Sequence, residues 1–394
     1  MSAAAPSAST TTPLTVPTPG RVGSNVYATL AGDPVNMLTG NLVHDERDLY
    51  LKGRGLPIAL QRWYNSGDPV DGPFGYGWTH SFNHVVRLYG VEGGAAKVGW
   101  LNGSGGESFF STTAHINGNI VRGVTLTNSA GVEVQFTRVS GGPDDGKYRI
   151  RERNGTVYLF TNPNGPNVLP SASSAVVARL ESITDRNSNR LSLNYNGSGA
   201  AAQLSTITDG IGRTVLTFTW TGSHITRVTD LSGRQVNYAY TDGNGNLTQL
   251  TDALGRVHRY SYYGPADGPK LDHRLKRHTL PRGNGMAFEY YSGGQVFRHT
   301  PFDVQGALIE SAATTFHYNL FARQSWSVNE RGFEHRFTFD AAGNAVRIVE
   351  GNGAEHEYAY DPARPHNRLS DTDAVGRRTT TTYNAQNLVE TLTL

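Results

Sequence analysis

Apolar and polar residues alternate in short runs along this chain, and the runs recur at a nearly constant spacing. The clearest copies lie within residues 228–262. There Val236, Tyr238 and Tyr240 occupy every second position, with polar or small residues between them. Because neighbouring side chains of a strand point to opposite faces, this alternation predicts half-buried β-strands.

Each alternating run follows the same short motif, Asp-x-x-Gly-Arg, which spans residues 230–234 and again 252–256. Aspartate can accept hydrogen bonds from the backbone of its own turn, and glycine adopts the positive φ that other residues resist. The repeating unit is therefore predicted to be a β-hairpin. The aspartates that begin successive units are 21 to 24 positions apart: Asp185, Asp209, Asp230 and Asp252. Weaker copies follow near Gly285, Gly332, Gly353 and Gly376.

The repeats predict how the whole chain is organised. A single hairpin cannot cover its own aromatic face, so the hairpins must add edge to edge, and a sheet of many strands curls. We therefore expect an all-β fold in which repeated antiparallel hairpins form a long curled sheet. We expect a disordered Ala/Ser/Thr/Pro leader at residues 1–24, a β domain at 25–165, and the repeat sheet at 166–394, irregular at 264–328.

Composition and charge narrow the functional classes. The 394 residues include 46 glycines and no cysteine, so disulfides and thiolate catalysis are excluded. The net charge of +2 gives no electrostatic argument for nucleic acid. No run approaches the roughly 18 apolar residues that span a bilayer, so we expect no membrane span. The N-terminal residues lack the basic start and apolar centre of a cleavable signal peptide, which favours a non-classical route for any export.

Three histidines each stand two positions before an aromatic residue, on the same predicted face: His258, His335 and His356. If stacked hairpins bring His335 and His356 near one another, these two form a pH-sensitive or metal-binding strip. The alternative, which we favour, is that each imidazole is a flat filler beside an aromatic ring.

Four acidic residues and a histidine cluster early in the chain, as paired carboxylates for acid–base chemistry would: Asp33, Asp45, Glu46 and Asp48, with His44. Turn capping and local ion pairs are the favoured interpretation. The basic stretch at 271–282 is interpreted as a solvated loop, with a partner or nucleic-acid contact as the alternative. Calcium binding by the Asp turns and sugar binding by the aromatics stay open. No catalytic, cofactor-binding or metal-binding residue is assigned, and no cofactor is expected.

Two sets of motifs resemble the Rhs or YD-repeat family. Its repeat carries a Tyr-Asp pair, two variable residues, then Gly-Asn and an apolar residue, which residues 339–345 match with Phe for Tyr and residues 383–388 match loosely. Residues 30–90 resemble the domain that precedes the repeats in Rhs proteins. The matching motifs are Gly32-Asp33-Pro34-Val35, Thr39-Gly40, Asp48-Leu49, Arg62-x-Tyr64-Asn65-Ser66 and Gly75-x-Gly77-Trp78.

The resemblance implies a function. In that family the sheet spirals into a hollow shell around a C-terminal toxin of the same polypeptide, and the family serves bacterial competition. It implies that this chain is a non-enzymatic wall fragment, secreted or at the cell surface through a specialised secretion system. Its expected partners are the remaining repeat and toxin segments, an immunity protein and the secretion apparatus. The family's Asp-Pro-x-Gly core motif and a toxin domain are not expected within these residues. The alternative is a self-contained carbohydrate-binding or adhesive surface protein.

Overall fold

The computed structural model describes residues 30–32, 34–53, 55–128, 134–162, 177–197, 201–384 and 389–394. The leader predicted at residues 1–24 lies outside this part. The described residues form β-strands and turns, with two short 3-10 turns, η3 (Pro265–Asp267) and η4 (Glu310–Ala312), and no α-helix among them. The all-β prediction is confirmed. No helix in the described residues is long and apolar enough to span a membrane.

Eight strands close into a ring. The strands, in the order in which they pair, are β8 (Val85–Glu92), β9 (Ala95–Leu101), β10 (Glu107–Thr112), β13 (Thr127–Asn128), β14 (Val134–Arg138), β15 (Tyr148–Glu152), β16 (Val157–Thr161) and β17 (Val177–Thr184). Residues 177–179 of β17 pair with β8 and complete the circuit. A small hairpin, β11 (His115–Ile116) and β12 (Asn119–Ile120), projects from it.

The long sheet leaves the ring at β17. While 177–179 pair with β8, residues 182–184 on the same strand pair with β18, so β17 is the branch point. From there each strand pairs antiparallel with the next: β18 (Arg190–Asn196), β19 (Gln203–Asp209), β20 (Thr214–Thr221), β21 (His224–Asp230), β22 (Gln235–Ala239), β23 (Gln249–Thr251), β24 (Val257–Tyr262), β25 (Leu275–Thr279), β26 (Gly285–Tyr290), β27 (Val296–Phe302), β28 (Thr314–Asn319), β29 (Gln324–Val328), β30 (Glu334–Phe339), β31 (Ala345–Val349), β32 (Glu355–Asp361), β33 (Arg364–Thr372), β34 (Arg378–Tyr383) and β35 (Val389–Thr393).

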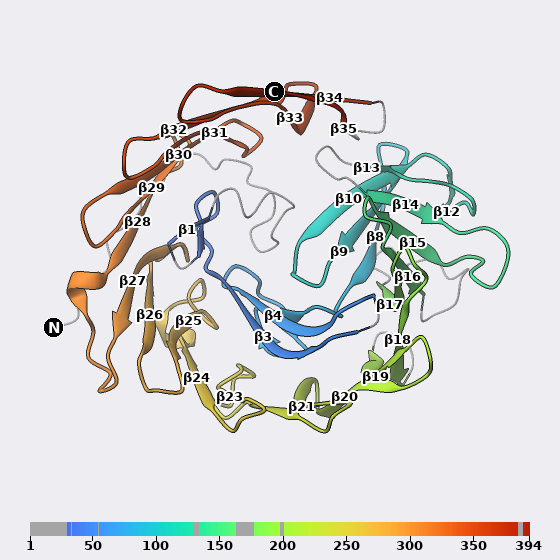
Figure 1. The fold of residues 1–394 in the computed structure, drawn as a ribbon, viewed down its shortest axis with the longest axis horizontal. Helices are drawn as coiled ribbons and strands as arrows, with labels where there is room; N and C mark the ends of the chain where they lie inside the picture. Colours follow the sequence, from blue (N-terminus) through green and yellow to red (C-terminus); the bar gives the residue numbers. More distant parts are fainter. Residues whose placement is uncertain are drawn as a thin grey trace.

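This sheet is curled but not closed. Figure 1 shows it bending around most of a circle, from the green strands through yellow to red. Among the described residues β35 pairs only with β34. Pairing is continuous across 264–328, where the sequence predicts irregularity, because η3 and η4 lie in the connections between strands. The predicted long curled sheet is confirmed.

A second, smaller sheet lies on the concave side of the long one (Figure 1). It consists of β3 (Val43–Leu51), β4 (Ile58–Asn65) and β7 (Trp78–His80), paired in that order. We call it the inner sheet, and we call the long sheet the wall. Two short hairpins flank the inner sheet: β1 (Leu30–Ala31) with β2 (Val35–Asn36), and β5 (Asp71–Gly72) with β6 (Gly75–Tyr76). Inner sheet and wall share one buried apolar core.

The turns of the wall have the predicted geometry. In the turn after β21, Oδ1 of Asp230 accepts hydrogen bonds from the backbone N–H of Ser232 and Arg234. The Arg234 side chain donates back to Oδ2 at 2.7 Å. Gly233 has a φ of +82°, so the predicted roles of aspartate and glycine are confirmed. Asp209, Asp252 and Asp373 make the same set of bonds in their own turns.

A repeated tyrosine bond ties the hairpins together. In five units a tyrosine hydroxyl donates to the backbone carbonyl fifteen positions earlier, at 2.8 to 3.0 Å. The tyrosines are Tyr195, Tyr240, Tyr262, Tyr290 and Tyr383. Burying a tyrosine ring requires a partner for its hydroxyl, and this bond supplies it from the wall itself.

Candidate functional site

One face of β3 presents a row of polar side chains to the wall. His44, Glu46 and Asp48 stand at alternate positions and therefore share a face. The register with β4 shifts between Arg47 and Leu49, which leaves Asp48 as the extra residue of a β-bulge. Bulges redirect a side chain locally, and here the bulge accompanies an Asp48 side chain that is only 3% exposed.

Arg62 of β4 joins the two carboxylates. Its guanidinium is fully buried and donates from Nε and Nη2 to the two oxygens of Asp48 at 2.5 and 3.0 Å. Nη2 also donates to Oε2 of Glu46 at 2.7 Å, and the group lies 4.6 Å from the Trp78 ring centre. Burial disfavours its charge, but Asp48 and Glu46 outweigh burial and hold the pKa of Arg62 above its ordinary value.

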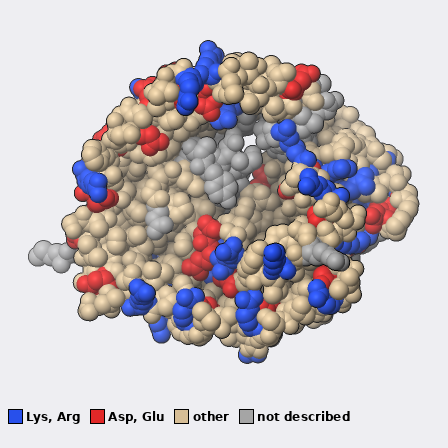
Figure 2. Space-filling view, in the orientation of Figure 1, with Lys and Arg blue, Asp and Glu red and all other residues tan. Residues whose placement is uncertain are grey.

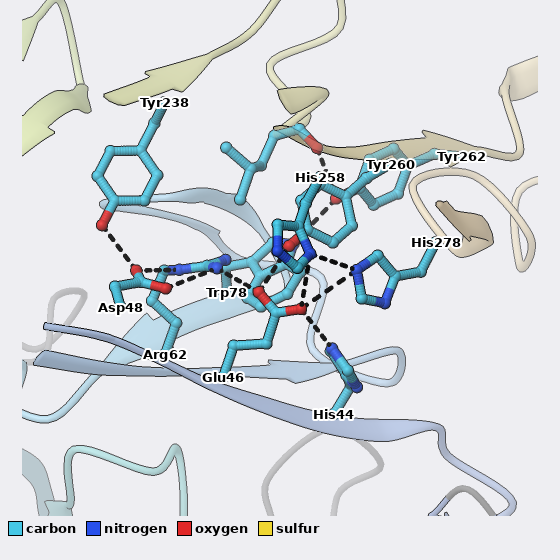
Figure 3. A network of polar contacts seen from close by, with 11 residues as sticks. His44, Glu46, Asp48, Arg62, Trp78, Tyr238, His258, Tyr260, Tyr262 and His278 are labelled. Carbon is cyan, nitrogen blue, oxygen red and sulfur yellow. Dashed lines mark hydrogen bonds and ion pairs between the residues drawn. The ribbon is translucent and has the colours of Figure 1, made fainter. Parts of the chain in front are cut away.

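The wall bonds to the same two carboxylates. The hydroxyl of Tyr238 on β22 donates to Asp48 at 2.6 Å, and that of Tyr260 on β24 donates to Glu46 at 2.7 Å. Trp78 donates through its indole N–H to the hydroxyl of Tyr262 at 2.9 Å (Figure 3). Burial raises the pKa of both carboxylate-bound tyrosines, so they stay protonated donors. We call this network the junction between inner sheet and wall.

Three imidazoles surround the other oxygen of Glu46. His44 and His278 each place Nε2 3.2 Å from Oε1, and Nδ1 of His258 lies 3.8 Å from it (Figure 3). Nδ1 of His258 is also 3.2 Å from Nε2 of His278. Although burial favours a neutral carboxyl, His44 and Arg62 hold the pKa of Glu46 below its ordinary value. Burial lowers the pKa of His278 to about 3.

The predicted histidine strip does not form. His335 on β30 and His356 on β32 are separated by β31, which places their strands about 10 Å apart. His335 faces Glu350 at 3.4 Å instead. Only His258 of the three reaches a histidine cluster, and its partners come from β3 and β25.

His278 was missed by the sequence interpretation. It lies in the basic stretch 271–282, which we predicted to be a solvated loop. That prediction is wrong for Leu275–Thr279, which form β25, with His278 only 6% exposed. The sequence carried no clear signal, because a register shift at Lys276 puts the two buried residues, Leu275 and His278, three positions apart and breaks the alternation typical of a strand.

The early acidic cluster divides. Glu46 and Asp48 enter the junction, whereas Asp45 points to the opposite face and accepts a hydrogen bond from Gln61 at 2.6 Å. Asp33 lies outside the described residues.

A cavity of about 390 Å³ opens beside the junction, lined by Glu46, Asp48 and His258 together with the turn 252–256 of the wall. Arg62 and the wall tyrosines already bond both carboxylates, so the arrangement is chiefly one that holds the two sheets together.

Sequence comparisons identify two segments. A family described as a domain of unknown function (DUF6531) matches residues 32–110, which include the inner sheet. A family described as RHS Repeat matches residues 221–257, which include β21 to β23 and the turns around them. The two matches fall on the two sheets that the junction joins.

Curated relatives match over a short stretch. A tRNA nuclease WapA of Bacillus subtilis (strain 168) is 34% identical over 80 residues, which are 20% of this chain and 3% of that protein. A tRNA3(Ser)-specific nuclease WapA of Bacillus spizizenii matches to the same extent. The chain thus matches only about 3% of the length of these relatives.

A comparison with solved structures gives low-scoring matches. The match to a crystal structure named TcdB2-TccC3-Cdc42 spans 89% of this chain and 26% of the matched chain, at 11% sequence identity and a TM-score of 0.32. The N-terminal domain of the effector SpvB from Salmonella typhimurium strain LT2 covers 64% of this chain with 96% of its own, at 16% identity and a TM-score of 0.30.

The family assignment rests on the sequence matches and on the repeated turns. An RHS Repeat match coincides with the best-formed Asp-x-x-Gly-Arg hairpins, and further copies of those hairpins continue to β34. The chain therefore contains Rhs/YD-type repeats, matched by the RHS Repeat family over residues 221–257, and they follow a segment at residues 32–110 that matches DUF6531.

Proposed function

We propose that this chain forms part of the wall of a shell that encloses a toxin segment of the same system. The observation that carries the proposal is the continuous antiparallel sheet from β17 to β35, which curls around a concave side (Figure 1). A wall needs strands that add edge to edge, and Asp-led turns and tyrosine bonds support that addition in several repeats.

The junction gives the proposal a second support. It fastens the inner sheet to the concave face through the buried guanidinium of Arg62, the buried carboxylate of Asp48 and the partly buried carboxylate of Glu46, so the pre-repeat domain narrows the enclosed space. The relatives named as nucleases match over a small part of their length, and the proposal assigns their activity to other segments. This chain would act as a non-enzymatic scaffold, exported with its remaining repeat and toxin segments, an immunity protein and a secretion apparatus.

Protease protection tests the proposal. The chain is expressed with the remaining segments of its system, and the rate at which trypsin digests the toxin segment is followed. We expect protection in the wild type, loss of protection in Arg62→Ala, and retained protection in Arg347→Ala, which removes an exposed ion pair with Glu355. Equal digestion with and without this chain would overturn the proposal. Specific binding on a glycan array would support the adhesive alternative instead.

A further inference from the structure

The histidines of the junction converge on one carboxylate oxygen, Oε1 of Glu46. The ligand atoms of His44, Glu46 and His278 all lie within 4.8 Å of one another. His258 adds a fourth nitrogen, 3.2 Å from that of His278. These residues come from β3, β24 and β25, so both the inner sheet and the wall contribute.

The distances from Glu46 to the imidazole nitrogens are close to those in a tetrahedral metal site. Atoms bound at the usual Zn–N and Zn–O distances of about 2.0–2.1 Å lie about 3.3 Å from one another at the corners of a tetrahedron. Oε1 of Glu46 is 3.2 Å from the nitrogens of both His44 and His278, and 3.8 Å from that of His258. Side-chain rotations that close the wider separations, of up to 4.8 Å among His44, Glu46 and His278, would place these ligand atoms around one ion.

Proton counting also favours an ion. A neutral imidazole carries one N–H, and each ring nitrogen either donates or accepts. Nε2 of His278 lies 3.2 Å from both Oε1 of Glu46 and Nδ1 of His258, so one proton on it must be shared between two acceptors. If the proton sits on His258 instead, two lone pairs face each other across the contact with Glu46. A metal ion would accept every one of these lone pairs.

The charge and the outer contacts are suitable. Glu46 and Asp48 share the single guanidinium of Arg62, which leaves the junction with surplus negative charge that a cation would offset. Arg62 and Tyr260 hold Oε2 of Glu46 and leave Oε1 directed at the imidazoles. Such outer hydrogen bonds orient metal-binding carboxylates in proteins. The neighbouring cavity, which Glu46 and His258 line, provides an access route.

We propose that His44, Glu46 and His278, with His258 as the fourth ligand, bind a divalent transition-metal ion, and that nitrogen and oxygen ligands at this spacing favour Zn²⁺. The ion would link the inner sheet to the wall. This inference does not depend on the proposed shell function, because metal binding is measured on the chain alone.

Zinc titration is the first test. Protein without a polyhistidine tag is freed of metal and titrated with Zn²⁺ against a chromophoric chelator. We expect one equivalent bound per chain. His44→Gln and His278→Gln should each weaken binding by more than about 100-fold, since even the loss of an outer partner costs about 10- to 100-fold. Tyr260→Phe, which removes such a partner, should weaken binding by about 10-fold.

The control is His335→Gln, because His335 also faces a glutamate but stands alone on β30. We expect it to bind Zn²⁺ as the wild type does. Co²⁺ provides a readout on the wild type that does not depend on the variants folding: a tetrahedral site gives strong visible absorption. An absence of zinc binding, a Co²⁺ spectrum like that of the free ion, or equal loss in His335→Gln would each overturn the inference.

Discussion

Ser188 occupies a backbone position that glycine holds in the other Asp-led turns of the wall. Its φ is +66°, close to the +82° of Gly233 in the equivalent position of the turn after β21. The aspartate that begins the turn makes the same bonds in both cases, so the strain at Ser188 is imposed by its neighbours. The spacing of the aspartates predicted a unit beginning at Asp185, but it did not reveal the strained backbone at Ser188.

Ser188→Gly should therefore stabilise the protein. The left-handed conformation destabilises a residue with a Cβ by about 1–2 kcal/mol, and glycine removes this penalty. Glycine also loses more conformational entropy on folding, which offsets about 0.5–1 kcal/mol of the gain. We expect a gain of about 0.5–1 kcal/mol, measured as a higher urea midpoint. Gly233→Ser is the matched reverse change, because nothing lies within 4 Å of an added Cβ there. A lower midpoint for Ser188→Gly would contradict the argument.

The second residue-scale prediction concerns Arg62. Arg62→Ala leaves Asp48 and Glu46 buried without their cation, and breaking a buried ion pair in this way costs about 3–5 kcal/mol. We expect a large drop in the thermal midpoint, measured by circular dichroism. The exposed pair of Arg347 and Glu355 is the control, and Arg347→Ala should leave the midpoint unchanged. Similar decreases of the thermal midpoint in both variants would show that the buried ion pairs of Arg62 stabilise the fold no more than an exposed pair does.

At the scale of elements, local pattern predicted the hairpins and missed how they meet. Turn chemistry and alternation are encoded within a few residues, so the unit around Asp230 was correctly predicted. The pairing of β8 with β17 joins residues about ninety positions apart, and no local period records it. The same holds for His44 and His278, which meet only because the inner sheet lies against the wall. The sequence analysis singled out the junction residues of β3 and His258 of β24, but it did not predict that they contact each other or His278.

The segment between β7 and β8 gives a prediction on pH. His84 stacks on Trp100 and Tyr158 and bonds to the backbone carbonyl of Ser81. Burial lowers the pKa of His84 to about 4, and burial together with His84 lowers that of His80 to about 3. The unfolded chain takes up these protons near pH 6.5, whereas the folded chain resists them.

The free energy of unfolding should consequently fall as the pH drops from about 6.5 towards 4. Above pH 6.5 the two histidines are neutral in both states, so they add no pH dependence there. Each contributes a slope of at most about 1.4 kcal/mol per pH unit as the pH drops. Urea midpoints measured across pH 4–7 test this, and His84→Gln should flatten part of the slope. A profile with the same slope in His84→Gln would refute the assignment.

At the scale of the whole molecule, the mixed surface charges of the described residues define no single-sign patch that would attract a partner. Figure 2 shows basic and acidic side chains side by side around the visible face, in keeping with a net charge of +2. Association must therefore come from shape and from strand edges. The wall presents one such edge at β35, whose described pairing is with β34 alone.

An unpaired strand edge is a template for another strand, because its backbone N–H and C=O groups lack partners. We expect the isolated chain to self-associate through β35, seen as a concentration-dependent sedimentation coefficient. Leu392 on β35 is 63% exposed, and Leu392→Lys should shift the distribution towards monomer, since lysine on an edge opposes strand addition. Leu254→Lys is the control: Leu254 is 78% exposed but sits in a turn of the wall. A wild type that stays monomeric at high concentration, or equal effects of both substitutions, would exclude the β35 edge as the assembly surface.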